Sequence, residues 1–518
     1  MLRARMPPDP ESTRDALPAP NASVAFVPAS EVAPVVARAR AAQPAWAALS
    51  IEARVQRPRN VKDRLLARVE ALAAEVHRET GKPEVEAIVA ECLPAADVID
   101  YWATNIEELL VATELEIDRL DYPGKVGWTY RDPCGVVGLI TPWNYPVGIP
   151  MRTLVPALLA GNAVVWKPSE VAPGSAKLVG DLFLDLVPVG VVEVVQGGGD
   201  AGLALAEADV DLVVCVGSVE TGRAVGKACA ERVSPCVLQL GGKDAAIVLA
   251  DANLDRAAHG VVWGSLVNAG QSCAAIERVY VVASVADAFV EKVKAEVASL
   301  RRGVELGPMA TERGRERVAT QVAAAAEAGG KVVQGGATDE RFIAPIVVRV
   351  DPDASPLLEG ETFGPVIPVA TVKTPEEAVA RANASRYGLT ASVWSRDIDA
   401  AETLAQKLHV GVVTINNHGL PAALPGAPWS GRGQTGSGVT GSPLSLDTLT
   451  RPRFVLTDRS RRKRELWWYP YTPAFRRMLL ALAVLRSGGT GIFAKVAALF
   501  AVIGAFTKRF AKQSDQAR

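Results

Sequence analysis

The residues best suited to chemistry are at positions 268–273 (NAGQSC), a short loop of small and amide side chains that ends on Cys273. Gly264 and Gly270 can relax the backbone around it, and the apolar, β-branched run at 278–282 (RVYVV) predicts a strand that holds the loop in place. A thiol displayed in this way can attack a carbonyl carbon if its thiolate is stabilised nearby. Most single cysteines are small buried hydrophobic residues, so the significance of Cys273 depends on the rest of the chain.

Short apolar runs alternate with helical segments in the central part of the chain, which predicts βαβ units and a parallel sheet. In open α/β sheets a ligand lies beyond the carboxyl ends of the strands, so a nucleotide is expected at the turns that follow the first four runs. The runs are 136–141, 163–166, 191–196, 212–216 and 245–249, and the turns are TPWN (141–144), KPSE (167–170), GGG (197–199) and GS (217–218). Before them, helical spacing recurs at 32–48 and 59–78, and Pro58 is expected to begin the second of these helices.

The length and composition predict an intracellular, multidomain globular protein. The 518 residues exceed the roughly 250–300 at which one hydrophobic core stops growing. The net charge of −1 gives the whole chain no nucleic-acid signature. The six cysteines include no CxxC pair, which favours a reduced, cytoplasmic protein, and the N-terminus lacks the apolar run of a signal peptide. The four histidines never fall at metal-ligand spacing, so no metal is expected.

Taken together, the motifs resemble those of the aldehyde dehydrogenase superfamily over about residues 30–455, and loosely its bacterial semialdehyde-oxidising branch. The resemblance implies that the Cys273 thiolate adds to an aldehyde, that hydride then passes to NAD, and that water hydrolyses the resulting thioester. It also implies that the Asn144 amide, in the PWN motif, stabilises the negative oxygen of the tetrahedral state.

The same resemblance assigns the cofactor contacts. Lys167 and Glu170 would take the ribose hydroxyls of the adenosine, and Glu170 would repel a 2′-phosphate, which favours NAD over NADP. Residues 217–222 would set the pyrophosphate against a helix N-terminus, and Glu361 and Phe363 would hold the nicotinamide ribose and ring. The cofactor residues implied are Trp143, Lys167, Ser169, Glu170, Gly217, Ser218, Gly222, Leu240, Glu361 and Phe363.

Three departures from the family pattern concern turnover. Gln239 stands where the family has its glutamate base, and a glutamine cannot take a proton from water or from a thiol. General-base catalysis is typically worth about 10²–10⁴-fold, so thioester hydrolysis is expected to be slow unless another group substitutes. The segment 428–436 carries Ser430, Gly433 and Thr435 where glycine, lysine and serine are common, and Thr153 replaces a frequent lysine.

These departures leave two other functions open. One is a CoA-acylating semialdehyde dehydrogenase, in which CoA rather than water resolves the thioester, so that no glutamate is needed at 239. The other is a non-catalytic relative that binds nucleotide and serves as a membrane-associated scaffold. An aldehyde panel with NAD and NADP, with and without CoA, would separate the three.

The expected fold class is α/β, with a Rossmann-like parallel sheet in the cofactor domain, a second α/β catalytic domain and a small β arm for oligomerisation. We predict a loose N-terminal arm (1–30), an NAD-binding domain (31–114 and 134–240) and a catalytic domain (241–439). Oligomerisation strands are expected at 115–133, in a hairpin, and at 440–455, and they would build a homodimer or homotetramer.

Residues 456–518 are predicted to form a basic, amphipathic tail. From 451 onward there are fifteen Lys and Arg against three acidic residues, with an aromatic cluster at 466–471 and apolar segments at 478–485 and 496–506. Neither segment approaches the roughly 20 apolar residues that span a bilayer. Residues 459–512 are therefore expected to lie on an anionic membrane surface, at its inner face. The alternative is a terminal helical pair packed on the enzyme or on a partner subunit.

Overall fold

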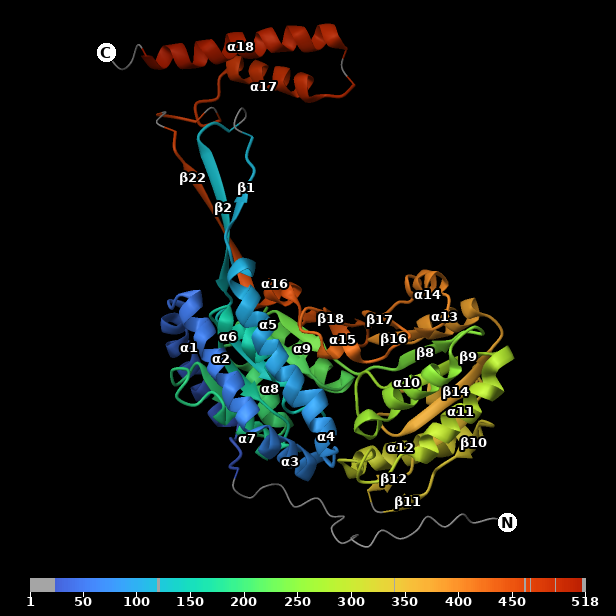
Figure 1. Ribbon diagram of the computed structural model, residues 1–518. Coiled ribbons are helices and arrows are strands. Elements are labelled where there is room, and N and C mark those ends of the chain that lie inside the picture. The colour runs from blue at the N-terminus through green and yellow to red at the C-terminus, as the bar shows by residue number, and fades with distance from the viewer. Residues whose placement is uncertain are drawn as a thin grey trace, which may run out of the picture. The chain divides into compact units, whose positions relative to one another are not determined.

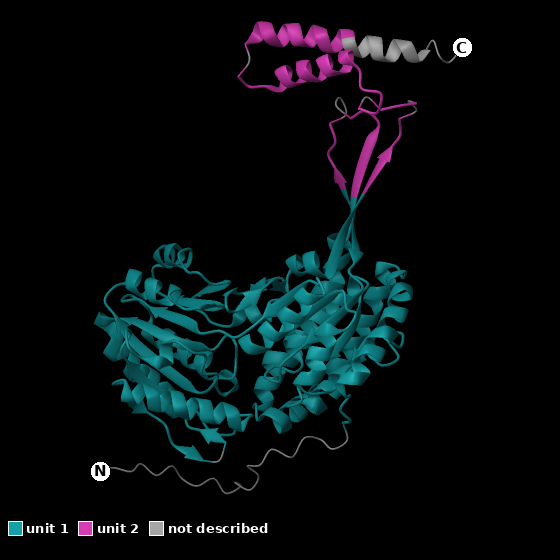
Figure 2. Cartoon of the chain, turned by 180° about the vertical axis from the view of Figure 1, so that it is seen from behind, with its two compact units in different colours: residues 1–113, 129–454 teal, residues 114–128, 455–518 magenta. Residues whose placement is uncertain are grey.

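The computed structural model describes residues 24–118, 122–339, 341–460, 463–465, 467–489 and 491–514, with the backbone alone at 505–514. The chain divides into two compact units, residues 1–113 with 129–454 and residues 114–128 with 455–518 (Figure 2). Most of the predicted loose arm, residues 1–23, lies outside the described residues. In the remainder of that arm, the Val27 N–H donates to the Gln196 carbonyl at 2.7 Å.

The first unit contains a six-stranded sheet in the order β20-β7-β6-β3-β4-β5. Its pairs are parallel except for β20 against β7, and β3 and β4 are buried along their whole length. Buried β-branched runs joined by helical crossovers are the pattern that specifies such a sheet. The strands are β3 (Val136–Ile140), β4 (Ala163–Lys167), β5 (Val192–Val194), β6 (Leu212–Val216), β7 (Cys236–Gln239) and β20 (Gly436–Ser437), and the crossover helices are α6 (Gly148–Leu159), α7 (Pro173–Asp181), α8 (Gly199–Glu207) and α9 (Val219–Glu231).

A second, seven-stranded sheet lies in the same unit, in the order β10-β13-β14-β9-β8-β16-β17 (Figure 1). All its neighbours are parallel except β10 against β13. The strands are β8 (Asp244–Val248), β9 (Ile276–Val282), β10 (Lys331–Gln334), β13 (Ile346–Val350), β14 (Val366–Val372), β16 (Thr390–Trp394) and β17 (Val412–Ile415), and the helices are α10 (Leu254–Leu266), α11 (Ala286–Ser299), α12 (Glu312–Glu327), α13 (Pro375–Asn383) and α14 (Ile398–Ala405).

The two sheets confirm the predicted α/β class. The run at 245–249 forms β8, which pairs with β9 and β16 in the second sheet and not with the four runs that precede it. The chain crosses from β7 to β8 through Gly241 and Gly242, which lets the last strand of one sheet and the first strand of the other follow each other closely.

Helices at the N-terminus pack on the first sheet and on its crossover helices, and they contribute residues to one wall of the site. They are α1 (Val32–Ala47), α2 (Ile51–Ala67), α3 (Val69–Thr80), α4 (Glu84–Ala87) and α5 (Leu93–Leu109), with a π-helical turn, Ile88–Cys92, before α5. The prediction that Pro58 begins a helix is wrong, because Pro58 lies inside α2. Ser50 caps that helix instead, since its Oγ accepts from the Ala53 N–H at 3.2 Å.

A three-stranded sheet, in the order β1-β2-β22, contributes residues to both units. Its strands are β1 (Thr113–Leu115), β2 (Lys125–Pro133) and β22 (Thr450–Asp458). The predicted hairpin corresponds to the neighbouring strands β1 and β2, and residues 119–121 of its turn lie outside the described residues. The side chains of β22 are exposed beyond Thr450, including Phe454 and Leu456.

The second unit ends in two helices, α17 (Pro473–Arg486) and α18 (Ile492–Ser514), which pack against each other. Phe475, Met478 and Ala481 of α17 are buried, as is Ala498 of α18. Among the described residues, none of the helices is long and apolar enough to cross a membrane. Residues 461, 462 and 466 of the predicted basic and aromatic stretch lie outside the described residues.

Candidate active site

Cys273 follows a strained turn that connects α10 to β9. Asn268, Ala269 and Gly270 have φ angles of 54°, 55° and 73°, so three consecutive residues adopt the left-handed region that costs about 1–3 kcal/mol for a residue with a side chain. Gln271 holds this turn, because its Nε2 donates to the Asn268 carbonyl at 2.9 Å and its Oε1 accepts from the Ala310 N–H at 2.9 Å. Hydrogen bonds to Asn268 and Ala310 thus hold the turn that leads to Cys273.

Gly270→Ala is expected to destabilise the protein by at least about 1–3 kcal/mol. An alanine at this position would have to adopt the positive φ. Its Cβ would also lie 2.2 Å from the carbonyl oxygen of Gly364, which is a backbone atom and cannot move aside as a flexible side chain could. The midpoint of urea unfolding measures the loss. Gly199→Ala is the matched control, since nothing lies within 4 Å of its added Cβ, and an equal loss in both variants would contradict this reading of the turn.

The Asn144 loop and the Cys273 loop are bound to each other. The Asn144 Nδ2 donates to the Gln271 carbonyl at 3.1 Å, and the Asn268 Nδ2 donates to the Asn144 carbonyl at 3.1 Å. The Asn144 Nδ2 therefore keeps a second N–H that is not used in the bond to Gln271. Its Oδ1 is buried without a partner among the described residues. The two side chains that the sequence singled out for carbonyl chemistry lie on loops with a fixed mutual position.

A buried ion pair supports the Asn144 loop from the N-terminal helices. Lys82 Nζ lies 2.6 Å from Glu91 Oε1 with both side chains fully buried, and it also donates to the Asn144 carbonyl at 2.7 Å. Glu91 Oε2 accepts from the Val147 N–H at 2.8 Å. Glu91 comes from the π-helical turn, a feature frequent at functional sites, and no sequence pattern had pointed to either residue.

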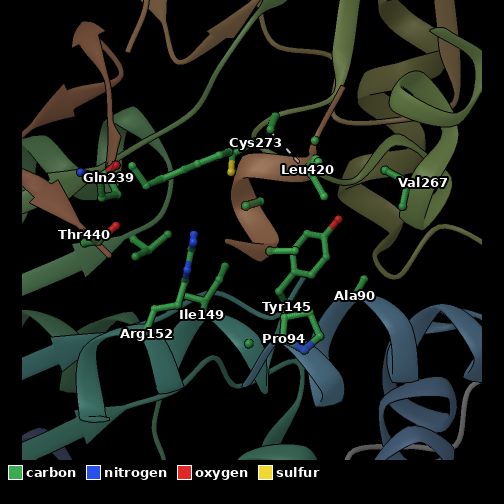
Figure 3. Close-up of a pocket in the computed structure, with 18 of the residues that line it drawn as sticks. Ala90, Pro94, Tyr145, Ile149, Arg152, Gln239, Val267, Cys273, Leu420 and Thr440 are labelled. Atoms are coloured by element: carbon green, nitrogen blue, oxygen red, sulfur yellow. Dashed lines mark hydrogen bonds between the residues drawn. The ribbon is translucent and has the colours of Figure 1, made fainter. Parts of the chain in front are cut away.

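An apolar cavity of about 460 Å³ opens beside Cys273 (Figure 3). Arg152 extends into it from α6, and its guanidinium lies 5.7 Å from the centre of the Trp429 ring. Its Nη2 is buried and has no hydrogen-bond partner among the described residues. Burial lowers the pKa of Arg152 to about 10, so the group still carries its charge at neutral pH. The cavity therefore presents apolar walls with a single unpaired cation among the described lining residues.

The Cys273 thiol is neutral at pH 7 in this environment. Burial raises its pKa to about 12, and the charges of Asp244 and Glu361 add to the rise. Because the thiolate is the nucleophilic form, the reaction needs positive charge near the sulfur when substrate binds.

Gln239, at the end of β7, lies on the wall between the apolar cavity and a second, polar cleft. Its Nε2 donates to the Gly438 carbonyl at 3.1 Å, while its Oε1 is buried without a partner among the described residues. Thr435 supports the same wall, since its Oγ1 donates to the Gly241 carbonyl at 2.9 Å. The altered segment at 428–436 thus helps to fix the backbone next to Gln239.

The polar cleft, of about 770 Å³, is where most of the predicted cofactor residues meet. Ser218 caps α9, and its Oγ accepts from the Thr221 N–H at 3.1 Å, so the N-terminus of a 13-residue helix faces this cleft. The Trp143 and Phe363 rings lie 6.0 Å apart, edge to face. A helix N-terminus, glycine backbone and aromatic rings fit the phosphates and bases of a dinucleotide. The predicted residues in its lining are Trp143, Asn144, Gly217, Ser218, Gln239, Leu240, Cys273, Glu361 and Phe363.

Four predicted cofactor residues are not part of that lining. Lys167 and Ser169 are buried, and Lys167 Nζ lies 3.1 Å from the exposed Glu170 carboxylate at the end of β4. Lys167 pairs with Ile140 of β3, so these residues share the carboxyl edge of the sheet with the Asn144 loop. Packing explains the glycine at position 222, because a Cβ there would lie 2.4 Å from the Leu240 side chain.

The Glu361–Phe363 loop is held by a buried pair. Glu277 accepts from the backbone N–H groups of Thr362, at 2.6 Å, and Phe363, at 2.7 Å, and it lies 2.6 Å from Lys243 Nζ. Burial and the nearby Glu277 charge raise the pKa of Glu361 to about 7. Glu361 therefore changes its charge near neutral pH inside the polar cleft.

Sequence reasoning missed the cations of this cleft. Arg223, Arg313, Arg317 and Arg386 line it, and guanidinium groups are suited to phosphate oxygens. Arg313 and Arg317 are one turn apart on α12, whereas Arg223 comes from α9 and Arg386 from a loop, so no single local pattern joins all four. Among the described residues, no group of three or more His, Cys, Asp or Glu side chains could hold a metal ion.

Comparison with known proteins gives a consistent result. The pattern of the Aldehyde dehydrogenase family matches residues 11–455. A 4,4'-diapolycopene aldehyde oxidase from Methylomonas sp is 35% identical over 84% of this chain and 83% of its own length, and Betaine aldehyde dehydrogenase 2 of Rhizobium meliloti (strain 1021) is 34% identical over 81% and 88%. PnpE of Pseudomonas sp. WBC-3, solved in complex with nicotinamide adenine dinucleotide, is similar with a TM-score of 0.82 at 32% identity, over 86% of this chain and 93% of PnpE. The chain belongs to the aldehyde dehydrogenase family.

Proposed function

We propose that this protein oxidises an aldehyde to a carboxylic acid with NAD, or with NADP as the alternative, through covalent catalysis by Cys273. The observation that carries the proposal is the position of the sulfur. Cys273 lines both the apolar cavity and the polar cleft, as do Ile149, Val216, Gln239 and Leu240. An aldehyde in the first and a dinucleotide in the second would meet at this cysteine.

Cys273 adds to the aldehyde carbon as its thiolate, and Arg152 is the cation on the same cavity wall that offsets the developing negative charge. The remaining N–H of the Asn144 amide, together with the Cys273 backbone N–H, stabilises the oxyanion, which is worth about 10²–10³ in rate per donor. When bound, NAD supplies the acceptor for the hydride that leaves the thiohemiacetal carbon. Water then releases the acid from Cys273.

An uncharged, apolar aldehyde is the substrate class that the cavity favours. Its lining is mostly aliphatic and aromatic. The relative from Methylomonas sp is named as an oxidase of 4,4'-diapolycopene aldehyde. Betaine aldehyde is cationic, and the unpaired Arg152 guanidinium would repel it in a water-poor site. For the cofactor, the Glu170 carboxylate beside Lys167 favours the 2′-hydroxyl of NAD over a 2′-phosphate.

A rapid-mixing assay of NADH formation tests the proposal, with aldehydes of increasing chain length, betaine aldehyde, and CoA present or absent. Because Gln239 cannot act as a base, we expect a burst of one NADH per active site followed by a slow steady rate, larger with NAD than with NADP. Acceleration of the steady rate by CoA would favour the CoA-acylating alternative. If the protein binds NAD but gives no burst with any aldehyde, the result would favour the non-catalytic scaffold.

We also propose a homodimer or homotetramer that is assembled through the strands near 115–133 and 440–455. The exposed apolar side chains of β22, Phe454 and Leu456, lie on a strand at the edge of its sheet, and such edges pair with other chains. Light scattering on the purified protein measures the mass.

The tail is proposed to contact an anionic membrane surface at the inner face. Phe493, Val496, Phe500 and Ile503 recur at helical spacing on α18 with exposed side chains, and Lys495 lies among them. We expect the full chain to sediment with vesicles that contain anionic lipid, less so at high salt, and Phe493→Glu to weaken this at least about threefold. Val233→Glu, at an equally exposed site in the other unit, is the control. Equal sedimentation of both variants, or self-association through the tail, would contradict membrane contact.

A further inference from the structure

Hydrolysis of a thioester on Cys273 requires a proton acceptor, and Gln239 cannot be one. The described residues that line the apolar cavity include no Asp or Glu, and those that line the polar cleft include Glu220 and Glu361. Glu220 is exposed and pairs with Arg313 at 3.8 Å. Glu86 has a buried, unpartnered oxygen but lines neither space.

His418 is the remaining candidate on the apolar cavity, and its chemistry is unfavourable. Its Nε2 lies 2.7 Å from the Ala274 carbonyl, which fixes that nitrogen as the donor and leaves the buried Nδ1 as the acceptor. Burial lowers the pKa of His418 to about 4, so the neutral ring holds a proton weakly at pH 7. A base works best when its pKa lies near the operating pH.

Glu361 lies against the backbone that touches the nucleophile loop. Its Oε1 accepts from the Gly242 N–H at 3.1 Å, and an added Cβ on Gly242 would lie 2.2 Å from the Cys273 carbonyl oxygen. An added Cβ on Gly241 would lie 2.7 Å from the same Glu361 oxygen. The Glu361 carboxylate and the Cys273 carbonyl therefore both lie against Gly242, and both side chains line the polar cleft.

We propose that Glu361 is the general base for hydrolysis of the Cys273 thioester, a role that rests on the covalent mechanism proposed above. Water forms a C–O bond to the thioester carbon while its proton passes to the Glu361 carboxylate. The C–S bond then breaks, the acid leaves, and the Cys273 sulfur takes up the proton that Glu361 held. One water is consumed, no electrons are exchanged, and both side chains return to their starting states.

The charges around Glu361 set the pH range of this role. Glu277 from β9 opposes its ionisation, whereas Lys243, Arg317 from α12 and the Gly242 N–H favour it, and the neutral Cys273 thiol faces the same cleft. With burial the net effect is a pKa of about 7, raised above the usual value. The base form therefore accumulates as the pH rises through about 7, and hydrolysis should speed up over that range.

The test uses the full chain with p-nitrophenyl acetate and no NAD, because acylation and hydrolysis of Cys273 then proceed without a cofactor. Nitrophenol release gives acylation as a burst and deacylation as the steady rate. We expect Glu361→Gln to keep the burst and to slow deacylation at least about tenfold. The wild-type deacylation rate should rise with pH around 7, and the variant should lose that rise. Glu359→Gln, an exposed glutamate of the same loop, is the matched control and should behave as wild type.

Adding Gln239→Glu to Glu361→Gln separates a lost base from a damaged fold. The second carboxylate should restore deacylation if the first variant lacks only a proton acceptor. Wild-type deacylation in Glu361→Gln, or no rescue by the double variant, would overturn the role of Glu361 while leaving the covalent mechanism intact. Failure of the wild-type protein to form any acyl-enzyme would instead overturn the covalent mechanism and, with it, this inference.

Discussion

Cys273→Ala is expected to lower NADH formation by at least about 10⁴-fold and to abolish the burst. Removal of a covalent nucleophile leaves only binding and oxyanion stabilisation, and knockouts of this kind in enzymes with a nucleophile and base cost up to about 10⁶ in rate. Among the described residues, Cys273 is the only cysteine or serine that lines both the polar cleft and the apolar cavity. The substitution is small enough for the loop to keep its fold, because Gln271 rather than the sulfur holds the turn.

The matched control for that variant is Cys236→Ala, at the start of β7. Cys236 is a half-buried free thiol that lines neither the apolar cavity nor the polar cleft. The Cys236→Ala variant should keep the burst and the steady rate within about twofold of wild type, as is usual for small changes away from a site. NADH formation at the wild-type rate by Cys273→Ala would end the covalent mechanism. Mass spectrometry of the protein quenched in the burst phase should find the acyl group on residue 273 alone.

The parts of this site that the sequence could predict are those that follow from strand ends. Asn144 and Ser218 each lie in the turn that follows a strand of one parallel sheet, and the carboxyl ends of such strands meet at one edge. Local patterns therefore suffice to bring these residues to the polar cleft. Cys273 follows a different rule, because its loop leads into the central strand β9 of the second sheet.

The rest depends on contacts between segments that are distant in the chain. Arg152 lies in the otherwise uncharged helix α6, and nothing in the helix sequence predicts where its side chain points. The packing of α6 places its guanidinium in the apolar cavity. The Lys82–Glu91 pair depends on a π-helical turn, whose hydrogen bonds reach one residue further along the chain than those of the α-helix used to predict helix faces. The prediction for Pro58 is wrong because a proline inside a helix is rare. Here the packing of the buried Pro58 side chain outweighs the preference of proline for the first turn of a helix.

Gln239→Glu is expected to raise the steady rate of NADH formation by about 10²-fold, with the burst amplitude unchanged. A carboxylate at 239 would face the acyl group from the wall that Gln239 shares with Cys273. General-base catalysis spans about 10²–10⁴-fold, and the lower end applies here because Glu361 would already supply part of the hydrolysis. Pre-steady-state NADH absorbance separates the burst from the steady phase. An unchanged steady rate with a persistent burst would refute the account of Gln239.

The same substitution should destabilise the folded protein, which gives an independent check on its cause. The Gln239 Nε2 donates to the Gly438 carbonyl, and an ionised glutamate can only place a second acceptor against that oxygen. Leaving a buried polar group unpaired costs about 1–3 kcal/mol, and the repulsion also raises the pKa of the new carboxyl group. Its base form then appears only as the pH rises, so the gain in rate should grow with pH. Gln239→Leu, which removes the same hydrogen bond without adding a base, should lose stability and gain no rate. A gain in Gln239→Leu equal to that of the glutamate would mean that loosening the wall, and not a proton acceptor, limits deacylation.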